Sequence, residues 1–342
     1  MKWNRIVLVW ALVAGLLTQS ISIVGQEIGS GKHDQAKSVD RERLHNPALW
    51  HDPGKIAELD LLNGQGGKDK RPVAPFKFES EDMHGTNPKF NVRDASGTKW
   101  RVKLGDEARP EVTASRLLWA VGYFVNDDYV LESAKVDGLQ LTRGANMAPD
   151  GNVVDARFER KPEARKKIGT WRWKDNPFNG TKEFNGLRVM MAVMNNWDLK
   201  DENNAVYEDR DSGRDLFLTS DVGATFGTNG LSWSKSRSKG DVDTFRKSKF
   251  ITHKTEAEVD FGTPAAPMPL EAANVKVYKM RRDLEWIGKK IPIADARWMG
   301  SLLKQLSHQQ LVDAFRAGQF PEEDTQRYVE VVESRIKELA EL

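Results

Sequence analysis

The stretch NNWDLKDENNAV, residues 195–206, carries an acid, a base and an amide in close order: Asp198, Lys200 and Asn203. An apolar run precedes it and a short β-like run follows it. A carboxylate can orient a hydroxyl group, an amine can neutralise a transferred phosphoryl group, and an amide oxygen can bind a divalent metal. This order indicates a phosphoryl-transfer loop. Taken alone, Asn-Asn-Trp-Asp is also typical of a solvated turn.

A lysine and a glutamate upstream are candidates for the phosphate-binding side of such a site. The segment KFNVRDASGTKWRVKLG (89–105) consists of two alternating runs around Asp-Ala-Ser-Gly, which predicts a β-hairpin with Lys103 on its second strand. Pro110 is at a favoured first-turn position of the next helix. Glu111 follows it, and we expect Glu111 to pair with Lys103; Glu107 is the alternative partner.

A second hairpin is predicted downstream of the quoted stretch. NAVY (204–207) and DLFLTSD (215–221) are short strand candidates separated by the turn-rich sequence EDRDSGR. Asp221 at the end of this hairpin is a candidate metal ligand. Gly223 is expected to give the sharp turn after it.

The remaining pattern places strands before helices. Strands are expected in 128–141 and 152–161, an irregular segment in 161–185, and a helix in 185–197. Residues 223–270 show no clear period and are expected to form a long loop. The last third contains three helical segments: RWMGSLLKQLS, HQQLVDAFRAG and PEEDTQRYVEVVESRIKELAEL. The order indicates an α+β fold.

These motifs resemble those of protein kinases. WDLKDEN resembles the kinase catalytic loop, SDVG resembles the metal-binding Asp-Phe-Gly motif, and RVKLG resembles the strand that carries the small-lobe lysine. The resemblance is closest to the atypical branch, which includes HipA-type kinases, secretory-pathway kinases and spore-coat kinases. HGTNPKFNVRDASGTKWRVK is similar to the HipA-type phosphate loop. The resemblance implies a two-lobed protein-kinase-like fold, with a β-rich N-lobe at 73–160 and an α-helical C-lobe at 161–342.

The resemblance also implies a role for each candidate residue. Asp198 and Lys200 would be catalytic, and Asn203 and Asp221 would bind Mg²⁺ or Mn²⁺. ATP would be the nucleotide. The residues expected to contact its phosphates or to orient that contact are Lys103, Glu111, Lys89 and Gly85.

Several positions depart from the kinase pattern. Asn196-Trp197 replaces the usual His-Arg, and Val222 replaces the Phe after the metal-binding Asp. No G-x-G-x-x-G precedes Lys103, and no Ala-Pro-Glu follows Asp221. A pseudokinase that binds a nucleotide or serves as a scaffold therefore remains the alternative within the same fold.

The N-terminus and the composition bear on location and partners. Residues 1–25 combine a basic start, an apolar run and small residues, as in a secretory signal peptide, so we expect an exported protein that contacts a membrane only if the signal is uncleaved. Residues 26–72 are polar and are expected to be a linker or extension. The net charge of +2 gives no field that favours nucleic acid. Protein, glycan and lipid-headgroup hydroxyls all remain open as acceptors.

The tryptophans support an alternative of a different class. The chain has 11 of them and no cysteine. A carbohydrate-binding surface would use their rings for stacking, with these candidates: Trp171, Trp173, Trp197 and Trp233. Most tryptophans are instead core or interface anchors. The basic stretch 232–249 is expected to be a solvated loop, or else a docking segment for an acidic partner.

Overall fold

The structure is a computed structural model, and it describes residues 38–85, 87–227, 239–262, 279 and 282–342. Residues 38–342 pack together as one unit. The expected signal peptide, Trp233 and the first part of the basic stretch, 232–238, lie outside the described residues. Within the described ranges, no helix is both long enough and apolar enough to cross a membrane.

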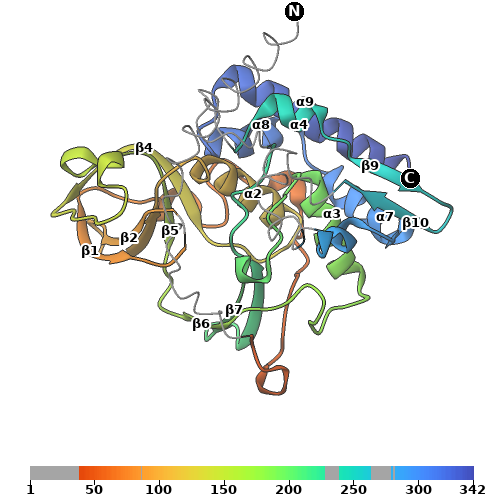
Figure 1. The fold of residues 1–342 in the computed structure, drawn as a ribbon, viewed down its shortest axis with the longest axis horizontal. Coiled ribbons are helices and arrows are strands. Elements are labelled where there is room, and N and C mark those ends of the chain that lie inside the picture. Colours follow the sequence, from red (N-terminus) through yellow and green to blue (C-terminus); the bar gives the residue numbers. More distant parts are fainter. Residues whose placement is uncertain (1–37, 86, 228–238, 263–278, 280–281) are drawn as a thin grey trace, which may run out of the picture. The chain divides into compact units, whose positions relative to one another are not determined.

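Five strands in the first half of the chain form a closed barrel in the order β1-β2-β3-β5-β4 (Figure 1). Its interior is a cluster of buried aromatic and branched side chains that includes Phe90, Trp100 and Phe158. The strands are β1 (Phe76–Asp82), β2 (Lys89–Arg93), β3 (Lys99–Lys103), β4 (Asp128–Asp137) and β5 (Asn152–Arg160). The predicted strands in 128–141 and 152–161 are thus present as β4 and β5.

The predicted hairpin of 89–105 is formed by β2 and β3. Asp94 organises its turn, because its carboxylate accepts hydrogen bonds from the N–H groups of Ser96 and Thr98 and from the indole of Trp100. These bonds, together with the interactions of Val73, hold the pKa of Asp94 below its usual value despite burial. The register pairs Lys89 with Lys103, so the two lysines are opposite each other at the open end of the hairpin.

Helix α2 (Ala108–Ala120) follows β3 and is buried along nearly its whole length. One side of it packs against β4 and β5, and another packs against α8 (His308–Ala317). Gln310 of α8 also donates to the carbonyls of Ile56 and Leu59. The helix predicted after Pro110 is therefore present and joins the barrel to the helical part of the chain.

Helix α3 (Lys182–Val193) leads into the quoted stretch. Thr181 caps its start by accepting from the N–H of Phe184. At its end, the N–H of Asn196 donates to the carbonyl of Met191 at 2.8 Å and that of Asn195 to Ala192 at 3.0 Å. This is a Schellman motif with Asn195 at φ 52, a conformation that Asn tolerates better than most residues. Asn195 and Asn196 thus end α3 directly before the loop that carries Asp198.

The second predicted hairpin is also present. β7 (Asn204–Asp209) pairs with β8 (Arg214–Thr219), and β6 (Arg165–Gly169) adds a third strand. The prediction of an irregular segment over 161–185 is wrong at β6, whose basic sequence does not alternate like a half-buried strand. Ala48 forms an isolated parallel bridge with Leu216.

The region expected to be a linker is packed in its described part. Leu49, Ile56 and Leu61 are at most 3% exposed and belong to the main core cluster. The prediction of a loose extension over 26–72 is therefore wrong for these residues. Their apolar side chains are too far apart in sequence to show a period.

The last part of the chain is helical, as predicted. Arg335 of its final helix donates to the carbonyls of Ala192 and Val193 at the end of α3, and burial lowers the pKa of Arg335 to about 9. The expected long loop over 223–270 contains regular structure in its described residues, as one helix and two strands. The helix and strands in that range are α4 (Val242–Lys247), β9 (Ile251–Lys254) and β10 (Glu258–Phe261). After them come β11 (Ile291–Pro292), α7 (Ile293–Leu303), α8 and α9 (Glu322–Ala340).

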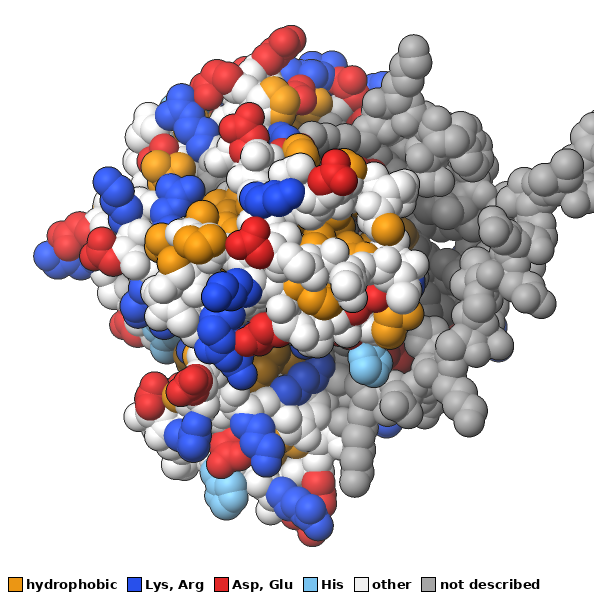
Figure 2. Space-filling model, turned by 90° about the vertical axis from the view of Figure 1, so that its left-hand side faces the viewer, with side chains coloured by type: hydrophobic (Ala, Val, Ile, Leu, Met, Phe, Trp, Pro, Cys, Tyr) orange, Lys and Arg blue, Asp and Glu red, His pale blue; other side chains and the backbone are white. Residues whose placement is uncertain are grey.

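Acidic and basic side chains are interspersed on the face in Figure 2, without one continuous field of either sign. This agrees with the small net charge of +2. The face therefore offers no extended basic surface of the kind that attracts polyanions from a distance.

Candidate active site

Lys103, the last residue of β3, is the centre of the candidate site. Its amine lies 3.0 Å from Glu111 Oε2 and 3.3 Å from Asp221 Oδ1, although Asp221 is 118 residues away in sequence. The Lys103 side chain is only 3% exposed. Burial alone would lower the pKa of Lys103, but the negative charges of Glu111 and Asp221 outweigh it and raise the pKa. The amine is thus held as a cation.

Glu111 lies in the first turns of α2 and is 1% exposed. Besides Lys103, it accepts a hydrogen bond from the guanidinium of Arg157. Burial raises the pKa of Glu111 to about 7, against the opposing effect of the Arg157 and Lys103 charges. Glu111 is therefore an orienting group between two cations, since both of its oxygens are engaged.

Arg157 is a site residue that the sequence did not indicate. It is opposite Lys103 in the β3–β5 strand register. Its guanidinium lies 2.9 Å (Nη2) from Glu159 Oε2 and 3.7 Å (Nη1) from Asp128 Oδ2. The pKa of Glu159 is held at about 2, because the charges of Lys161 and Arg157 overcome the effect of burial. Burial raises the pKa of Asp128 to about 7. Arg157, Glu159 and Asp128 thus form a buried network of alternating charge that contacts Glu111 through Arg157.

Glu107 contacts the same lysine. Its carboxylate lies 2.6 Å from the Lys103 amine and also accepts from Asn87 and Lys239. The Lys103 amine therefore contacts both of its predicted partners, Glu107 and Glu111.

Gly223 is needed for space rather than for a turn. It is not among the described glycines with positive φ, so it does not adopt the left-handed conformation for which a turn would require glycine. A Cβ atom at this position would lie 2.7 Å from the Cβ of Glu107. The residue after Val222 is thus a glycine because α2 begins directly against it.

The loop that carries Asp198, Lys200 and Asn203 is held by hydrogen bonds and an ion pair among its own residues. The Asp198 N–H donates to the Asn196 side-chain oxygen at 3.0 Å, and the Lys200 amine lies 3.1 Å from Asp198 Oδ2. The Asn203 amide donates to the carbonyl of Asp198 at 2.6 Å. The side chain of Asp198 is 22% exposed, so it is open to solvent in part.

Asn203 links this loop to Asp221. Its carbonyl accepts hydrogen bonds from the N–H groups of Ser220 at 2.8 Å and Asp221 at 3.0 Å. The structure thus brings together Lys103, Glu111 and Asp221 by direct contact, and Asp198, Lys200 and Asn203 through this backbone connection.

Asn203 and Asp221 fit a divalent metal ion. They supply an amide oxygen and a carboxylate, the hard ligands that Mg²⁺ prefers, and the Asp221 side chain is 43% exposed. The Lys103 and Arg157 charges hold the pKa of Asp221 below its usual value, against the effect of its partial burial, which keeps it ionised. Among the described residues, no group of three or more His, Cys, Asp or Glu could hold a metal. A metal here would need water and phosphate oxygens as further ligands.

The predicted phosphate contacts from the GTNPK turn lie beside Lys103. Lys89 is opposite Lys103 in the strand register, and its amine would be 3.1 Å from a Cβ added to Gly85. Gly85 has φ +72, a conformation that favours glycine. Burial lowers the pKa of Lys89. The turn therefore adds a second amine on the same side of the barrel.

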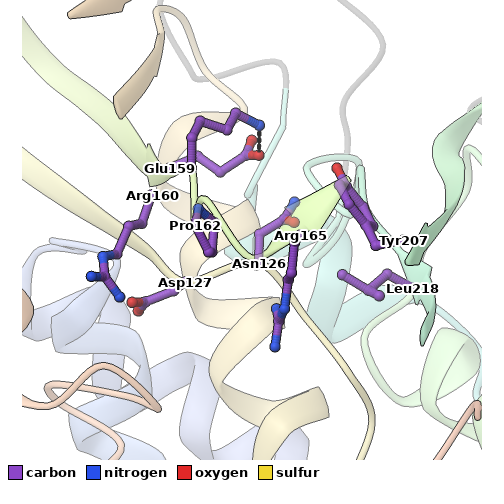
Figure 3. Close-up of a pocket in the computed structure, with 9 residues that line it drawn as sticks. Asn126, Asp127, Glu159, Arg160, Pro162, Arg165, Tyr207 and Leu218 are labelled. Atoms are coloured by element: carbon purple, nitrogen blue, oxygen red, sulfur yellow. Dashed lines mark hydrogen bonds and ion pairs between the residues drawn. The ribbon is translucent and has the colours of Figure 1, made fainter. Parts of the chain in front are cut away.

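A small cavity adjoins the charged network (Figure 3). Its volume is about 60 Å³, room for a few waters but not for a nucleobase. Figure 3 shows Glu159 with its ion pair at one edge and Asp127 beside the Arg160 side chain. The cavity is lined by Asn126, Asp127, Glu159, Arg160, Lys161, Pro162, Arg165, Tyr207 and Leu218.

The described tryptophans of the carbohydrate alternative are not available for stacking. Trp171 and Trp173 are each 1% exposed and Trp197 is 9% exposed. Trp171 and Trp173 contact each other edge to face, with ring centroids 4.9 Å apart. The expectation that these three form a sugar-binding surface is wrong, because they fill the core; Trp233 lies outside the described residues.

Comparison with known proteins gives a coarse likeness to a solved structure. No protein-family model matches the sequence, and no curated protein matches it. Among solved structures, the chain is similar to the Helicobacter pylori proinflammatory kinase CtkA, with 9% identity and a TM-score of 0.43. The match covers 79% of this chain and 98% of that one.

Proposed function

We propose that this protein is a two-lobed, kinase-like phosphotransferase that transfers a phosphoryl group from ATP to a hydroxyl acceptor with Mg²⁺ or Mn²⁺. The barrel and α2 would form the N-lobe, at 73–160, and residues 161–342 the C-lobe. One observation carries the proposal: the buried amine of Lys103 contacts both Glu111 and Asp221, which come from distant parts of the chain.

The upstream residues would bind the nucleotide. Lys103 is a buried cation with its position fixed by Glu111, which suits it to contact phosphate oxygens without reorganisation. Lys89 would add charge from the neighbouring strand. Arg157 would hold Glu111 in place from the opposite side.

The loop residues would act on the acceptor. Asp198 would accept a hydrogen bond from the acceptor hydroxyl and take its proton as the new oxygen–phosphorus bond forms. The bond between the γ-phosphorus and its bridging oxygen breaks, and ADP leaves. Lys200, 3.1 Å from Asp198, would neutralise charge on the transferred group.

Asn203 and Asp221 would hold the metal ion, which supplies charge neutralisation at the phosphates when bound. The hydrogen bond between their backbones keeps the two ligands adjacent.

We also propose where the protein acts and which hydroxyl groups accept the phosphoryl group. The N-terminal sequence supports export, and the hydroxyl acceptor could belong to a protein, a glycan or a lipid headgroup. A pseudokinase is the second candidate function, and one contact favours it: Glu107 already engages the Lys103 amine at 2.6 Å.

A transfer assay separates the two candidates. The chain without its expected signal peptide is incubated with γ-labelled ATP and MgCl₂, with and without EDTA, and both autophosphorylation and release of labelled phosphate to water are followed. We expect metal-dependent transfer. ATP binding, measured beside it by calorimetry, without transfer would identify a nucleotide-binding pseudokinase, and no binding at all would contradict the proposed phosphotransferase.

A further inference from the structure

Glu107 is held by three donors from three separate segments. The Lys103 amine comes from β3, the Asn87 amide from the turn before β2, and the Lys239 amine from the segment before α4. The Glu107 side chain is only 11% exposed. Two ammonium groups and an amide N–H₂ around one carboxylate form an arrangement that would equally suit a phosphate group.

We propose that Lys103, Asn87 and Lys239 form a phosphate subsite, and that the Glu107 carboxylate occupies it in this structure as an internal competitor. The proposal rests on the proposed function and deepens it, because it adds two residues to the polyphosphate site and a means of regulating it. The ligand class is a polyphosphate, either the nucleotide's own chain or an inorganic one.

The charges explain how Glu107 is held in the subsite and why a ligand can displace it. Lys103 is buried, and a buried cation is costly without partners. Glu107 supplies a third carboxylate, beside Glu111 and Asp221, when no polyphosphate is bound. A polyphosphate carries more negative charge and more acceptor oxygens than one carboxylate, so it can replace Glu107 against the same donors.

The local structure allows Glu107 to leave. It is the N-cap of α2, yet its side chain makes no capping hydrogen bond to the helix. Rotation of the side chain can therefore withdraw the carboxylate without unwinding α2. Glu111 differs, because it lies inside the helix and is held by Arg157 as well as Lys103.

Lys239 gives the subsite a link to the loop that carries Asp198. Its amine lies 5.8 Å from the centre of the Trp197 ring, directly before Asp198 in sequence. A phosphate held by Lys239 would therefore lie between the turn at Asn87 and the catalytic loop. The subsite thus connects the turn at Asn87 with the loop that carries Asp198, through the contacts of Asn87 and Lys239 with Glu107.

The test uses tripolyphosphate, which has no base or sugar, titrated calorimetrically into the full chain and its variants. Glu107→Gln keeps the size of the side chain but removes its charge, and we expect about tenfold tighter binding of tripolyphosphate. Lys239→Met is expected to weaken binding about tenfold, because one charged contact is lost. Glu132→Gln, on the exposed surface of β4, controls for net charge and should change nothing.

The outcomes separate this proposal from the proposed function. Unchanged or weaker binding by a folded Glu107→Gln variant overturns the subsite, even if the wild type transfers phosphate from ATP. Tighter binding supports the subsite, even if no variant shows transfer, in which case only the proposed activity fails. Should Glu107→Gln not fold, Lys239→Met decides: unchanged binding overturns the subsite. Absence of binding in both the wild type and Glu107→Gln overturns it as well.

Discussion

Replacement of Asp198 with asparagine is expected to lower phosphoryl transfer by roughly 10²–10⁴-fold, the range for loss of a general base. The variant keeps the shape of the side chain and its hydrogen bonds but cannot take the acceptor's proton. Asp198 makes no direct contact with Lys103 or Asp221 that would tie it to the nucleotide, as far as the described residues show; it is linked to them through Asn203. ATP affinity should therefore stay within about twofold of the wild type.

The measurement is a pair of experiments on each variant: transfer of labelled phosphate, and calorimetric ATP binding with MgCl₂. Asp175→Asn is the matched control, because Asp175 is 62% exposed and pairs with Arg41 outside the site. A full transfer rate in Asp198→Asn would disprove the role given to this residue. A parallel loss of binding and transfer would instead indicate that Asp198 supports the structure of the loop.

Replacement of Arg157 with methionine is expected to destabilise the fold by about 3–5 kcal/mol, the range for removal of one partner from a buried ion pair. Arg157 is 3% exposed and is the shared cation of Glu111, Glu159 and Asp128. Methionine fills much of the volume but leaves these carboxylates without their common partner. The loss should be measured by urea unfolding followed by circular dichroism.

The same variant should show a distinct pH dependence. The pKa values of Glu111 and Asp128 are already about 7 with Arg157 present, above those of the unfolded chain. Without the arginine they rise further, so the folded state binds more protons than the unfolded state and stability falls as pH rises through this range. The destabilisation should thus be larger at pH 8 than at pH 5.5.

Arg93→Met is the control for this experiment. Arg93 lies on β2 and forms a surface ion pair with Glu79, with side chains 40% and 32% exposed. Such pairs contribute about 0–1 kcal/mol. Equal destabilisation in Arg157→Met and Arg93→Met, without a pH effect, would contradict the central position of Arg157 in the network.

The parts of the site that could be predicted are those encoded locally. The hairpin of Lys103, the helix of Glu111 and the hairpin before Asp221 follow from alternation, turn residues and helical periodicity over short windows. The quoted loop is also local, since Asp198 and Asn203 are five residues apart and bond to each other.

The missed residues depend on pairings between distant segments. Arg157 reaches Glu111 because β5 pairs with β3, with Arg157 opposite Lys103 in a register that the sequence does not reveal. Glu107 contacts Lys239 across the fold, and the requirement for Gly223 arises only from that approach of α2. Burial of Trp171 and Trp173 is likewise a property of the assembled core, because the neighbours of a tryptophan in sequence do not show whether its ring packs in a core or at an interface.

The central claim is that Lys103, Asn203 and Asp221 together hold one polyphosphate and its metal ion. Calorimetric titration of ATP into the chain with MgCl₂, repeated with EDTA and with the Asp221→Asn variant, tests it most directly. The account predicts saturable binding that weakens at least about tenfold when either the metal or the Asp221 charge is removed, without further weakening when both are removed. ATP binding of equal strength under all these conditions, or no binding by the wild type, would contradict it.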